Sequence, residues 1–497
     1  MIALGGALAG LAMSALDTTI VNTAMATVVG DLGGLDSYTW IGTSYLLTST
    51  AATPLMGKLS DVYGRRRLFQ VAILVFMIGS LACGIAQDMF QLVLARGLQG
   101  VGGGGLFALA FTILGDVVSP RERGRYVGYF TSVFTVASVV GPLLGGFFVD
   151  TLNWRWIFLI NLPFGAVALV VTSRALRLPW TRQERTIDVM GAVLLVVATS
   201  ALLLAVSWSS HEYGWGSPVT VALLVTSAAV TAVFLTWEQR VKDPILPLRL
   251  FRVDVVRVIG PVMFIAGALL YNVNAFLPLF LQAVTGVSPT VSGLLLIPLA
   301  VSMALCGTLI GRRVASTGRY KQWPVRGFAA MAVGFVLLSL LQGSLAWVFV
   351  SMGAMALMGF GIGAVMPTST VAAQNAVEWN DLGVTSSLVM FLRSLGGAIG
   401  LAVWGAVLNS RLAGEVAPEL LRRPRDIGDL PEPQRTQTLD AVTDAITGTF
   451  MITIPFAIVG FLLLLALPER PLRTTSPLTR SRVAEQAASA PSPAPTA

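Results

Sequence analysis

Fourteen apolar blocks, most of them about as long as a helix that crosses a bilayer, recur along the 497-residue sequence. Only 12% of the residues are charged, whereas an average soluble chain carries about 25%, and 55% are hydrophobic. This pattern excludes an ordinary soluble domain and predicts an all-α membrane protein with fourteen transmembrane helices in a lipid bilayer. The blocks lie at residues 2–28, 38–57, 68–87, 90–114, 126–149, 155–174, 188–208, 218–237, 255–283, 289–311, 326–343, 345–373, 382–409 and 446–467.

The basic residues indicate how these helices cross the membrane. If the N-terminus is cytoplasmic, 25 of the 33 lysine and arginine residues fall in cytoplasmic loops or in the tail, as the positive-inside rule requires. A count that is wrong by one span would invert every later loop, so this agreement supports fourteen. We expect a multi-pass protein of the bacterial cytoplasmic (inner) membrane with both termini in the cytoplasm. The net charge of +8 lies in short loop clusters, which argues against nucleic acid as a partner.

One short loop pattern occurs twice. GKLSDVYGRRR at 57–67 and GRRVASTGRYK at 311–321 share the pattern G-x6-G-R-x-[R/K]. Matching loops imply that the segment beginning near the ninth span repeats the one beginning at the first, and internal duplication is typical of transporters. With six spans in each copy, the sequence predicts two pseudo-symmetric six-helix bundles and an inserted helix pair between them.

The predicted domains follow from this arithmetic. They are an N-terminal six-helix bundle (1–176), the inserted pair of spans 7 and 8 with its cytoplasmic linkers (177–254), a C-terminal six-helix bundle (255–468) that includes an outer segment (410–445), and a cytoplasmic tail (469–497). The tail is rich in Ser, Pro and Ala without an apolar period, so we expect it to be disordered. The outer segment either covers an exit path or is a variable loop.

Four motifs make the chain resemble a known family. They are LDTTIVN (Leu16–Asn22) in the first span, the loop Gly57–Arg67, LARGLQG (Leu94–Gly100) in the fourth span and GPLLGG (Gly141–Gly146) in the fifth. Over almost its whole length the chain resembles the major facilitator superfamily, specifically the fourteen-helix drug/proton antiporter branch of multidrug efflux transporters. The resemblance implies export of small amphipathic organic compounds, such as drugs, antibiotics and toxic cations, by a monomer that is driven by protons and uses no cofactor.

Three charged residues lie deep in the predicted spans, namely Asp17, Arg96 and Arg393. Such a charge costs about 2.5–3.5 kcal/mol at a helix centre, so each one needs a partner, a wet cavity or a function. Burial and nearby cations shift a carboxyl pKa in opposite directions, so Asp17 is suited to bind and release a coupling proton. The alternative is a hydrogen bond between helices. The resemblance implies that Arg96 assists proton transfer, with a purely structural cation as the alternative, and Arg393 is open between packing and function.

The repeat register suggests where substrate binds. Gly57 follows Asp17 by 40 positions, and the same offset from Gly311 leads to Tyr271, which we expect opposite Asp17. Hydrogen-bonding side chains beside it lie at the depth where transporters of this kind bind substrate, although helix–helix hydrogen bonds would explain them equally well. The candidate substrate contacts are Asp17, Asn22, Tyr271, Asn272, Asn274 and Arg393.

Two segments are expected to control conformational change. The resemblance assigns the first cytoplasmic loop to a latch between the two halves, in which guanidinium groups pair with a carboxylate. The second copy has Ala315 at the acidic position, so a matching second latch is in doubt. The glycine–proline stretch in the fifth span allows close packing and bending. The predicted switch residues are Gly57, Asp61, Gly64, Arg65 and Arg66, followed by Gly141, Pro142, Gly145 and Gly146.

Other chemistry finds no support in the sequence. Cys83 and Cys306 lie inside apolar blocks and are interpreted as packing residues, so we expect neither a disulfide framework nor a metal site. There is no GxxxxGK[ST] loop and no catalytic triad, which argues against ATP drive and against an enzyme. Two alternatives to drug export remain open at this stage: export of a lipid or of a single self-made antibiotic, and a non-transporting receptor or scaffold.

Overall fold

The computed structural model describes residues 2–32, 38–175, 188–211, 214–287, 289–342, 346–412, 416 and 430–473. Every regular element in these ranges is helical, which confirms the predicted all-α class. The helices of the first part are α1 (Ile2–Leu32), α2 (Tyr38–Tyr63), α3 (Arg65–Ile85), α4 (Met89–Val117), α5 (Pro120–Thr151), α6 (Trp156–Leu159) and α7 (Asn161–Ala175). Then come α8 (Val189–His211), α9 (Pro218–Glu238), η2 (Leu248–Arg252), α10 (Asp254–Ala283), α11 (Pro289–Leu295), α12 (Ile297–Thr317), α13 (Gln322–Ser339), α14 (Ala346–Ala376), η3 (Trp379–Asp381), α15 (Leu382–Leu412) and α17 (Gln434–Leu465).

Eleven of the described helices are long and apolar enough to cross a membrane. Helices α2, α5 and α13 do not meet this criterion. Two of the three pack between other helices, since α2 lies against α4 and α15, and α5 lies against α12 and α1. A helix that faces protein on several sides tolerates more polar residues than one surrounded by lipid. The count of fourteen spans therefore stays a prediction. The described helices are those of a multi-pass membrane protein.

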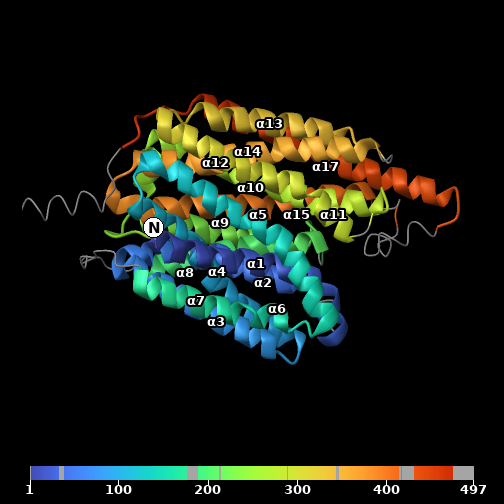
Figure 1. Cartoon of the computed structure of the whole chain (residues 1–497), viewed down its shortest axis with the longest axis horizontal. Coiled ribbons are helices and arrows are strands. Elements are labelled where there is room, and N and C mark those ends of the chain that lie inside the picture. Colours follow the sequence, from blue (N-terminus) through green and yellow to red (C-terminus); the bar gives the residue numbers. More distant parts are fainter. Residues whose placement is uncertain are drawn as a thin grey trace, which may run out of the picture.

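The helices run side by side along the long axis of the molecule (Figure 1). In this view most of the blue to teal helices of the first 175 residues lie on one side and most of the yellow to red helices on the other, while teal α5 crosses from one group to the other. Helix α8 packs against both α2 and α15, so the inserted pair bridges the two halves. The halves also touch directly where α5 packs on α12 and α2 packs on α15.

Local sequence explains where several helices begin. Asp88 accepts a hydrogen bond from the Gln91 backbone N–H at 2.8 Å and thereby caps the N-terminus of α4. Helix α9 begins in the same way, with Ser217 accepting from the Thr220 N–H at 3.1 Å and Pro218 at the first helical position. Both caps satisfy backbone donors that the helix itself leaves free.

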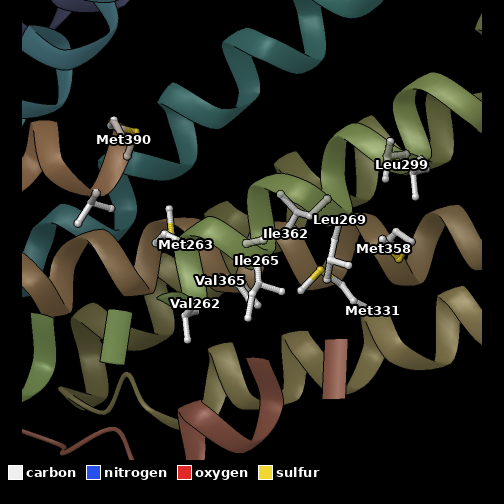
Figure 2. Close-up of a cluster of buried hydrophobic side chains, with 14 of the residues drawn as sticks. Val262, Met263, Ile265, Leu269, Leu299, Met331, Met358, Ile362, Val365 and Met390 are labelled. Atoms are coloured by element: carbon white, nitrogen blue, oxygen red, sulfur yellow. The ribbon is translucent and has the colours of Figure 1, made fainter. Parts of the chain in front are cut away.

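The core of the C-terminal half is built from aliphatic and methionine side chains. Figure 2 shows side chains of α10, α12, α13 and α14 meeting in this cluster. Met263, Leu269, Met331 and Met358 are fully buried there. In contrast, large apolar side chains such as Phe349, 75% exposed, lie on the outside, as expected for helices whose solvent is lipid. Packing of this kind positions α10 and α15 for the site described below.

The structure differs from the predicted blocks at three places. The sixth block is divided into α6 and α7, and the tenth into α11 and α12. The last helix begins at Gln434, so the predicted outer segment 410–445 is partly helical. Its first turns are polar and carry Asp440 and Asp444, which is why hydropathy alone placed the start of this helix later.

Candidate functional site

A buried hydrogen-bond network surrounds Asp17 in the N-terminal half. The Asp17 side chain lies on α1 and is 0% exposed. Arg96 Nη1 lies 2.6 Å from Asp17 Oδ2 in a buried ion pair, and Gln99 Nε2 donates to Oδ1 at 2.7 Å. Asn161 Nδ2, from the first residue of α7, also donates to Oδ1, at 2.9 Å. Both carboxylate oxygens of Asp17 therefore have donors, contributed by two other helices.

A second layer holds these donors in place. Ser80 on α3 accepts hydrogen bonds from Gln99 Nε2 at 3.1 Å and from Asn161 Nδ2 at 2.9 Å. It donates its own proton to the Phe158 carbonyl at 2.8 Å. Arg96 Nη1 also donates to Gln99 Oε1 at 2.7 Å, and the two residues share one face of α4 because they are three positions apart. A buried network that is satisfied in this way fixes the orientation of its members.

The network contains residues that sequence reasoning missed. Asp17 and Arg96 were both predicted to take part in proton coupling, and the structure brings them together. Gln99 lies inside the LARGLQG motif, so its spacing from Arg96 was a usable signal. Asn161 and Ser80 carried no such signal, because their positions depend on the break between α6 and α7 and on the packing of α3. Cys83 was interpreted as a packing residue, yet its thiol also donates to Gln99 Oε1 at 3.7 Å.

Tyr45 on α2 covers the other side of Arg96. The Arg96 guanidinium carbon lies 4.4 Å from the centroid of the Tyr45 ring, and the Tyr45 hydroxyl is 3.0 Å from Ser14 Oγ. A cation over an aromatic face is attracted to the ring. Tyr45 lies close enough to interact electrostatically with both Asp17 and Tyr271. The position of Tyr271 opposite Asp17 stays a prediction.

Glycines on α4 make this arrangement possible. A Cβ atom on Gly103 would lie 2.2 Å from the Tyr45 hydroxyl oxygen, and one on Gly102 would lie 2.5 Å from the Phe76 backbone nitrogen. Neither distance is tolerated between real atoms, so only glycine allows α2 and α3 to approach α4 this closely.

The fifth-span motif touches α1 two residues beyond Asp17. A Cβ atom on Gly141 would lie 2.1 Å from Thr19 Oγ1, which donates to the Ala137 carbonyl at 2.9 Å. Gly145 is buried, whereas a Cβ atom on Gly146 would meet no other atom within 4 Å. The side chain of Pro142 lies outside what the structure describes. A movement of α5 would therefore change the packing of α1 two residues away from the Asp17 carboxylate.

The C-terminal half presents a different polar centre. Arg393 on α15 places its guanidinium carbon 4.9 Å from the centroid of the Phe107 ring, which belongs to α4 in the other half. Asn272 is fully buried, and neither polar atom of its side chain has a hydrogen-bond partner within the described part of the chain. Asn274 is exposed and donates to the Leu270 carbonyl of its own helix at 2.9 Å. Asn22, a further predicted substrate contact, belongs to the residues whose side chains are not described.

The predicted latch lies at the C-terminal end of α2. Arg65 forms an ion pair with Asp61 and a second one with Asp116, whose Oδ2 lies 2.8 Å from Arg65 Nε. Gly64, between α2 and α3, has φ of 92°, a conformation that favours glycine. Burial raises the pKa of the Asp61 carboxyl, against the lowering effect of Arg65. Arg66 donates to the Ser173 carbonyl at 2.6 Å and so joins the loop to α7.

This latch contacts the start of α15. A Cβ atom on Gly57 would lie 1.9 Å from Ser387 Oγ, and one on Gly383 would lie 2.5 Å from Asp61 Oδ1. The Asp61 carboxylate therefore lies at the N-terminal end of α15, where the helix dipole favours a negative charge. The first loop thus joins the two halves through a carboxylate of one half and a helix N-terminus of the other.

The second loop makes a contact of the opposite polarity. Arg121, from the start of α5, donates to the carbonyls of Ala315 at 2.9 Å and Ser316 at 3.3 Å. These carbonyls end α12, where the helix dipole favours a cation. Arg123 also reaches across the halves and donates to Gln374 Oε1 at 2.9 Å, and burial lowers its pKa to about 10, so it is still a cation at neutral pH. The second loop thus has no acid at position 315, and Arg121 of the other half binds the backbone carbonyl of Ala315.

Residues 469–473 add hydrogen bonds to this contact. The Arg473 N–H donates to Asn375 Oδ1 at 3.0 Å, and Asn375 Nδ2 donates to the Pro471 carbonyl at 3.1 Å. The Arg121 N–H donates to the Arg473 carbonyl at 3.3 Å. These residues belong to the segment that the sequence predicts to be disordered, and the hydrogen bonds above join Pro471 and Arg473 to α14 and α5. The rest of the predicted tail, 474–497, lies outside the described residues.

Metal-binding groups do not occur in the described ranges. No cluster of three or more histidine, cysteine, aspartate or glutamate side chains there is arranged to hold a metal ion.

Comparison with known proteins identifies the family. The sequence profile of the Major Facilitator Superfamily matches residues 7–401. The chain is 37% identical over 416 residues to the Multidrug transporter protein MdtP of Bacillus subtilis, covering 84% of this chain and 76% of the relative. It is 32% identical over 495 residues to Multidrug resistance protein 3 of Bacillus subtilis, covering 96% of each. The proton:xylose symporter XylE shares the fold, with a TM-score of 0.64 at 13% identity over 97% of this chain and 98% of that one.

The chain belongs to the Major Facilitator Superfamily and is a multi-pass membrane transporter rather than an enzyme. The predicted resemblance to this family is confirmed. The likeness to the symporter supports the fold alone.

Proposed function

We propose that this protein is a proton-coupled antiporter that exports small amphipathic organic compounds across the bacterial cytoplasmic membrane by alternating access. In this proposal fourteen helices cross the membrane, both termini face the cytoplasm, the monomer is the working unit and the proton gradient replaces any cofactor. The names of two bacterial relatives, a multidrug transporter and a multidrug resistance protein, support drug export as the activity.

The observation that carries proton coupling is the buried pair of Asp17 and Arg96, 2.6 Å apart. Protonation of Asp17 would remove the negative charge and leave Arg96 buried without a counter-ion, which is unfavourable. A proton arriving at Asp17 therefore changes the energy of the arrangement of α1 and α4. Because Gly141 of α5 touches α1 at Thr19, that change reaches a helix that also packs on the C-terminal half.

The cytoplasmic contacts support the other part of the cycle. Asp61 lies at the N-terminal end of α15 and Arg121 binds the last carbonyls of α12, so the two halves are joined at their cytoplasmic ends. These contacts fit a state that is closed toward the cytoplasm. Opening toward the cytoplasm would require both to separate, and proton release from Asp17 on that side would accompany substrate binding.

The test uses the full chain in proteoliposomes with an imposed pH gradient and an internal pH-sensitive dye. We expect rhodamine 123 or fluorescein to dissipate the gradient, and Asp17→Asn to reduce this substrate-dependent proton flux at least tenfold. Asp150→Asn, the same change at an exposed residue of α5, is the matched control and should behave as wild type. Proton antiport is contradicted if no dye dissipates the gradient in the wild type, or if Asp17→Asn retains full flux.

A further inference from the structure

Arg393 differs from Asp17 and Arg96 because no acidic side chain in the described part of the chain pairs with it. The ion pairs among the described residues include Asp17 with Arg96 but none with Arg393. Its Nε atom is buried without a hydrogen-bond partner in the same part of the chain. A guanidinium group in a spanning helix is costly without a counter-charge, so such a group commonly marks a site whose counter-charge arrives with a ligand.

The partner that Arg393 does have is aromatic. Its guanidinium carbon lies 4.9 Å from the centroid of Phe107. The Phe107 ring contacts Phe111 at 5.5 Å and Phe134 at 5.4 Å between centroids, so rings from α4 and α5 form a continuous wall. Phe107 and Phe134 are only half-buried, which leaves part of each ring free to contact a ligand. A planar aromatic ligand would stack on such rings.

Helix α10 packs closely on α15 and contributes Tyr271, whose side chain carries a hydroxyl group, to the surroundings of Arg393. A Cβ atom on Gly267 would lie 2.0 Å from the Arg393 carbonyl oxygen, and one on Gly397 would lie 2.7 Å from Tyr271 Cδ2. The glycines therefore bring the Tyr271 ring onto α15 one turn away from Arg393, and Tyr271 interacts with Arg393 electrostatically. A phenol can donate a hydrogen bond to an anion that the guanidinium attracts.

We infer that Arg393, Tyr271 and the ring of Phe107 form a binding site for an aromatic organic anion, a carboxylate or sulfonate attached to a flat ring system. The inference rests on the proposed transport function and names its substrate class. The charges disfavour the opposite class at this place, because Asp17, the buried carboxylate of α1, already has donors on both oxygens and is paired with Arg96. An amphipathic cation would meet an unpaired positive charge instead of a negative one.

The position of Tyr45 connects this site to the proton site. Tyr45 interacts electrostatically with Asp17 and with Tyr271, and its ring supports Arg96. An anion bound between Arg393 and Tyr271 would therefore add a negative charge next to the residues that hold the Asp17–Arg96 pair. Export of that anion is also favoured by a membrane potential that is negative inside, in addition to the drive from the proton gradient.

The test compares two dyes with the same xanthene skeleton and opposite charge, fluorescein and rhodamine 123, by fluorescence anisotropy with the purified full chain in detergent. We expect the wild type to bind fluorescein at least tenfold more tightly than rhodamine 123. Arg393→Gln should weaken fluorescein binding at least tenfold and leave rhodamine 123 binding within twofold. Arg393→Lys should retain part of the preference, because it keeps the charge but loses the planar fork.

Two further variants keep the result interpretable. Arg326→Gln removes another arginine that lies over an aromatic ring, 5.4 Å from the centroid of Trp323, far from this site in the sequence, and should bind both dyes as wild type does. If Arg393→Gln does not fold, Phe107→Leu replaces it and should weaken fluorescein several-fold. Equal or tighter binding of rhodamine 123 by the wild type, or undiminished fluorescein binding by the variant that folds, overturns the inference.

The same dyes separate this inference from the proposed function. If a pH gradient does not drive dye export but fluorescein binding still depends on Arg393, proton antiport fails and the anion site stands. If a pH gradient drives export of rhodamine 123 but not of fluorescein, and Arg393→Gln changes neither, antiport stands and the anion site fails.

Discussion

The two halves of the molecule treat a buried charge in different ways. In the N-terminal half, Asp17 and Arg96 neutralise each other inside a network in which Gln99 and Asn161 occupy the remaining carboxylate lone pairs. In the C-terminal half, Arg393 has a ring of the other half and a tyrosine beside it, and no acid among the described residues. The molecule thus carries one closed charge pair and one open charge. In the proposed function the closed pair would hold the coupling proton and the open charge would accept a ligand.

The sharpest way to break this comparison is to remove each arginine. Arg96→Gln leaves Asp17 buried without its counter-ion, so we expect the free energy of unfolding to fall by about 3–5 kcal/mol. Arg393→Gln strands no acid, and the lost cation–π contact of about 0.5–1 kcal/mol is offset by the removed cost of burying a charge. We expect a change of less than about 1 kcal/mol for this variant. Unfolding by SDS titration in mixed micelles measures both.

A double variant controls this prediction. Asp17→Asn combined with Arg96→Gln removes both charges, so it should be more stable than Arg96→Gln alone. If Arg393→Gln destabilises the protein as strongly as Arg96→Gln does, then Arg393 has an acidic partner after all and the contrast between the halves disappears.

The sequence predicted the charged residues behind this contrast between the halves, but not how each of them is paired. Apolar blocks and the repeated loop predicted the helices and the two bundles, because hydropathy and local motifs do not depend on tertiary packing. The sequence also marked Asp17, Arg96 and Arg393 as costly charges. Whether an acid faces each arginine depends on how the helices are rotated, which a single sequence does not contain. Asn161 and the α12 carbonyls were missed for a related reason, since a helix break and a backbone oxygen have no identifying residue type.

The contacts of the two repeated loops give a second, weaker comparison between the halves. Asp61 faces the N-terminus of α15 and Arg121 faces the C-terminus of α12, so each exploits one end of a helix dipole. Such contacts are worth about 0.3–2 kcal/mol. We expect Asp61→Asn and Arg121→Gln each to increase the cytoplasmic opening equilibrium by about 2- to 30-fold, and the double variant to show the product of the two effects.

The measurement is the rate at which a membrane-impermeant maleimide, added from the cytoplasmic side, alkylates a cysteine placed at Ser387, which is buried against Gly57. The parent protein, with Cys83 and Cys306, supplies the background rate. Arg312→Gln, at an exposed arginine of α12, is the matched control. An effect from Asp61→Asn without any from Arg121→Gln would mean that the second loop does not act as a latch.

The smallest expected effect comes from Asp31, the exposed counterpart of Asp17 on the same helix. Asp31 Oδ2 accepts hydrogen bonds from Trp154 Nε1 at 2.8 Å and Arg155 Nη1 at 3.1 Å, and these donors lower the pKa of Asp31 below its ordinary value of 3.8. A lowered carboxyl pKa stabilises the fold above the ordinary pKa, and the contribution is lost as the pH falls through the folded-state pKa.

Asp31→Asn should therefore lower the thermal unfolding midpoint slightly at neutral pH, and the difference from wild type should shrink as the pH falls below 3.8. Water surrounds this pair and screens it, whereas protein surrounds the pair of Asp17 and Arg96, so the same two residue types should differ greatly in effect. Thermal unfolding of both proteins across this pH range measures the difference. A destabilisation by Asp31→Asn as large as that of Arg96→Gln would show that burial does not decide the strength of these pairs, and the contrast between closed and open charges would lose its physical basis.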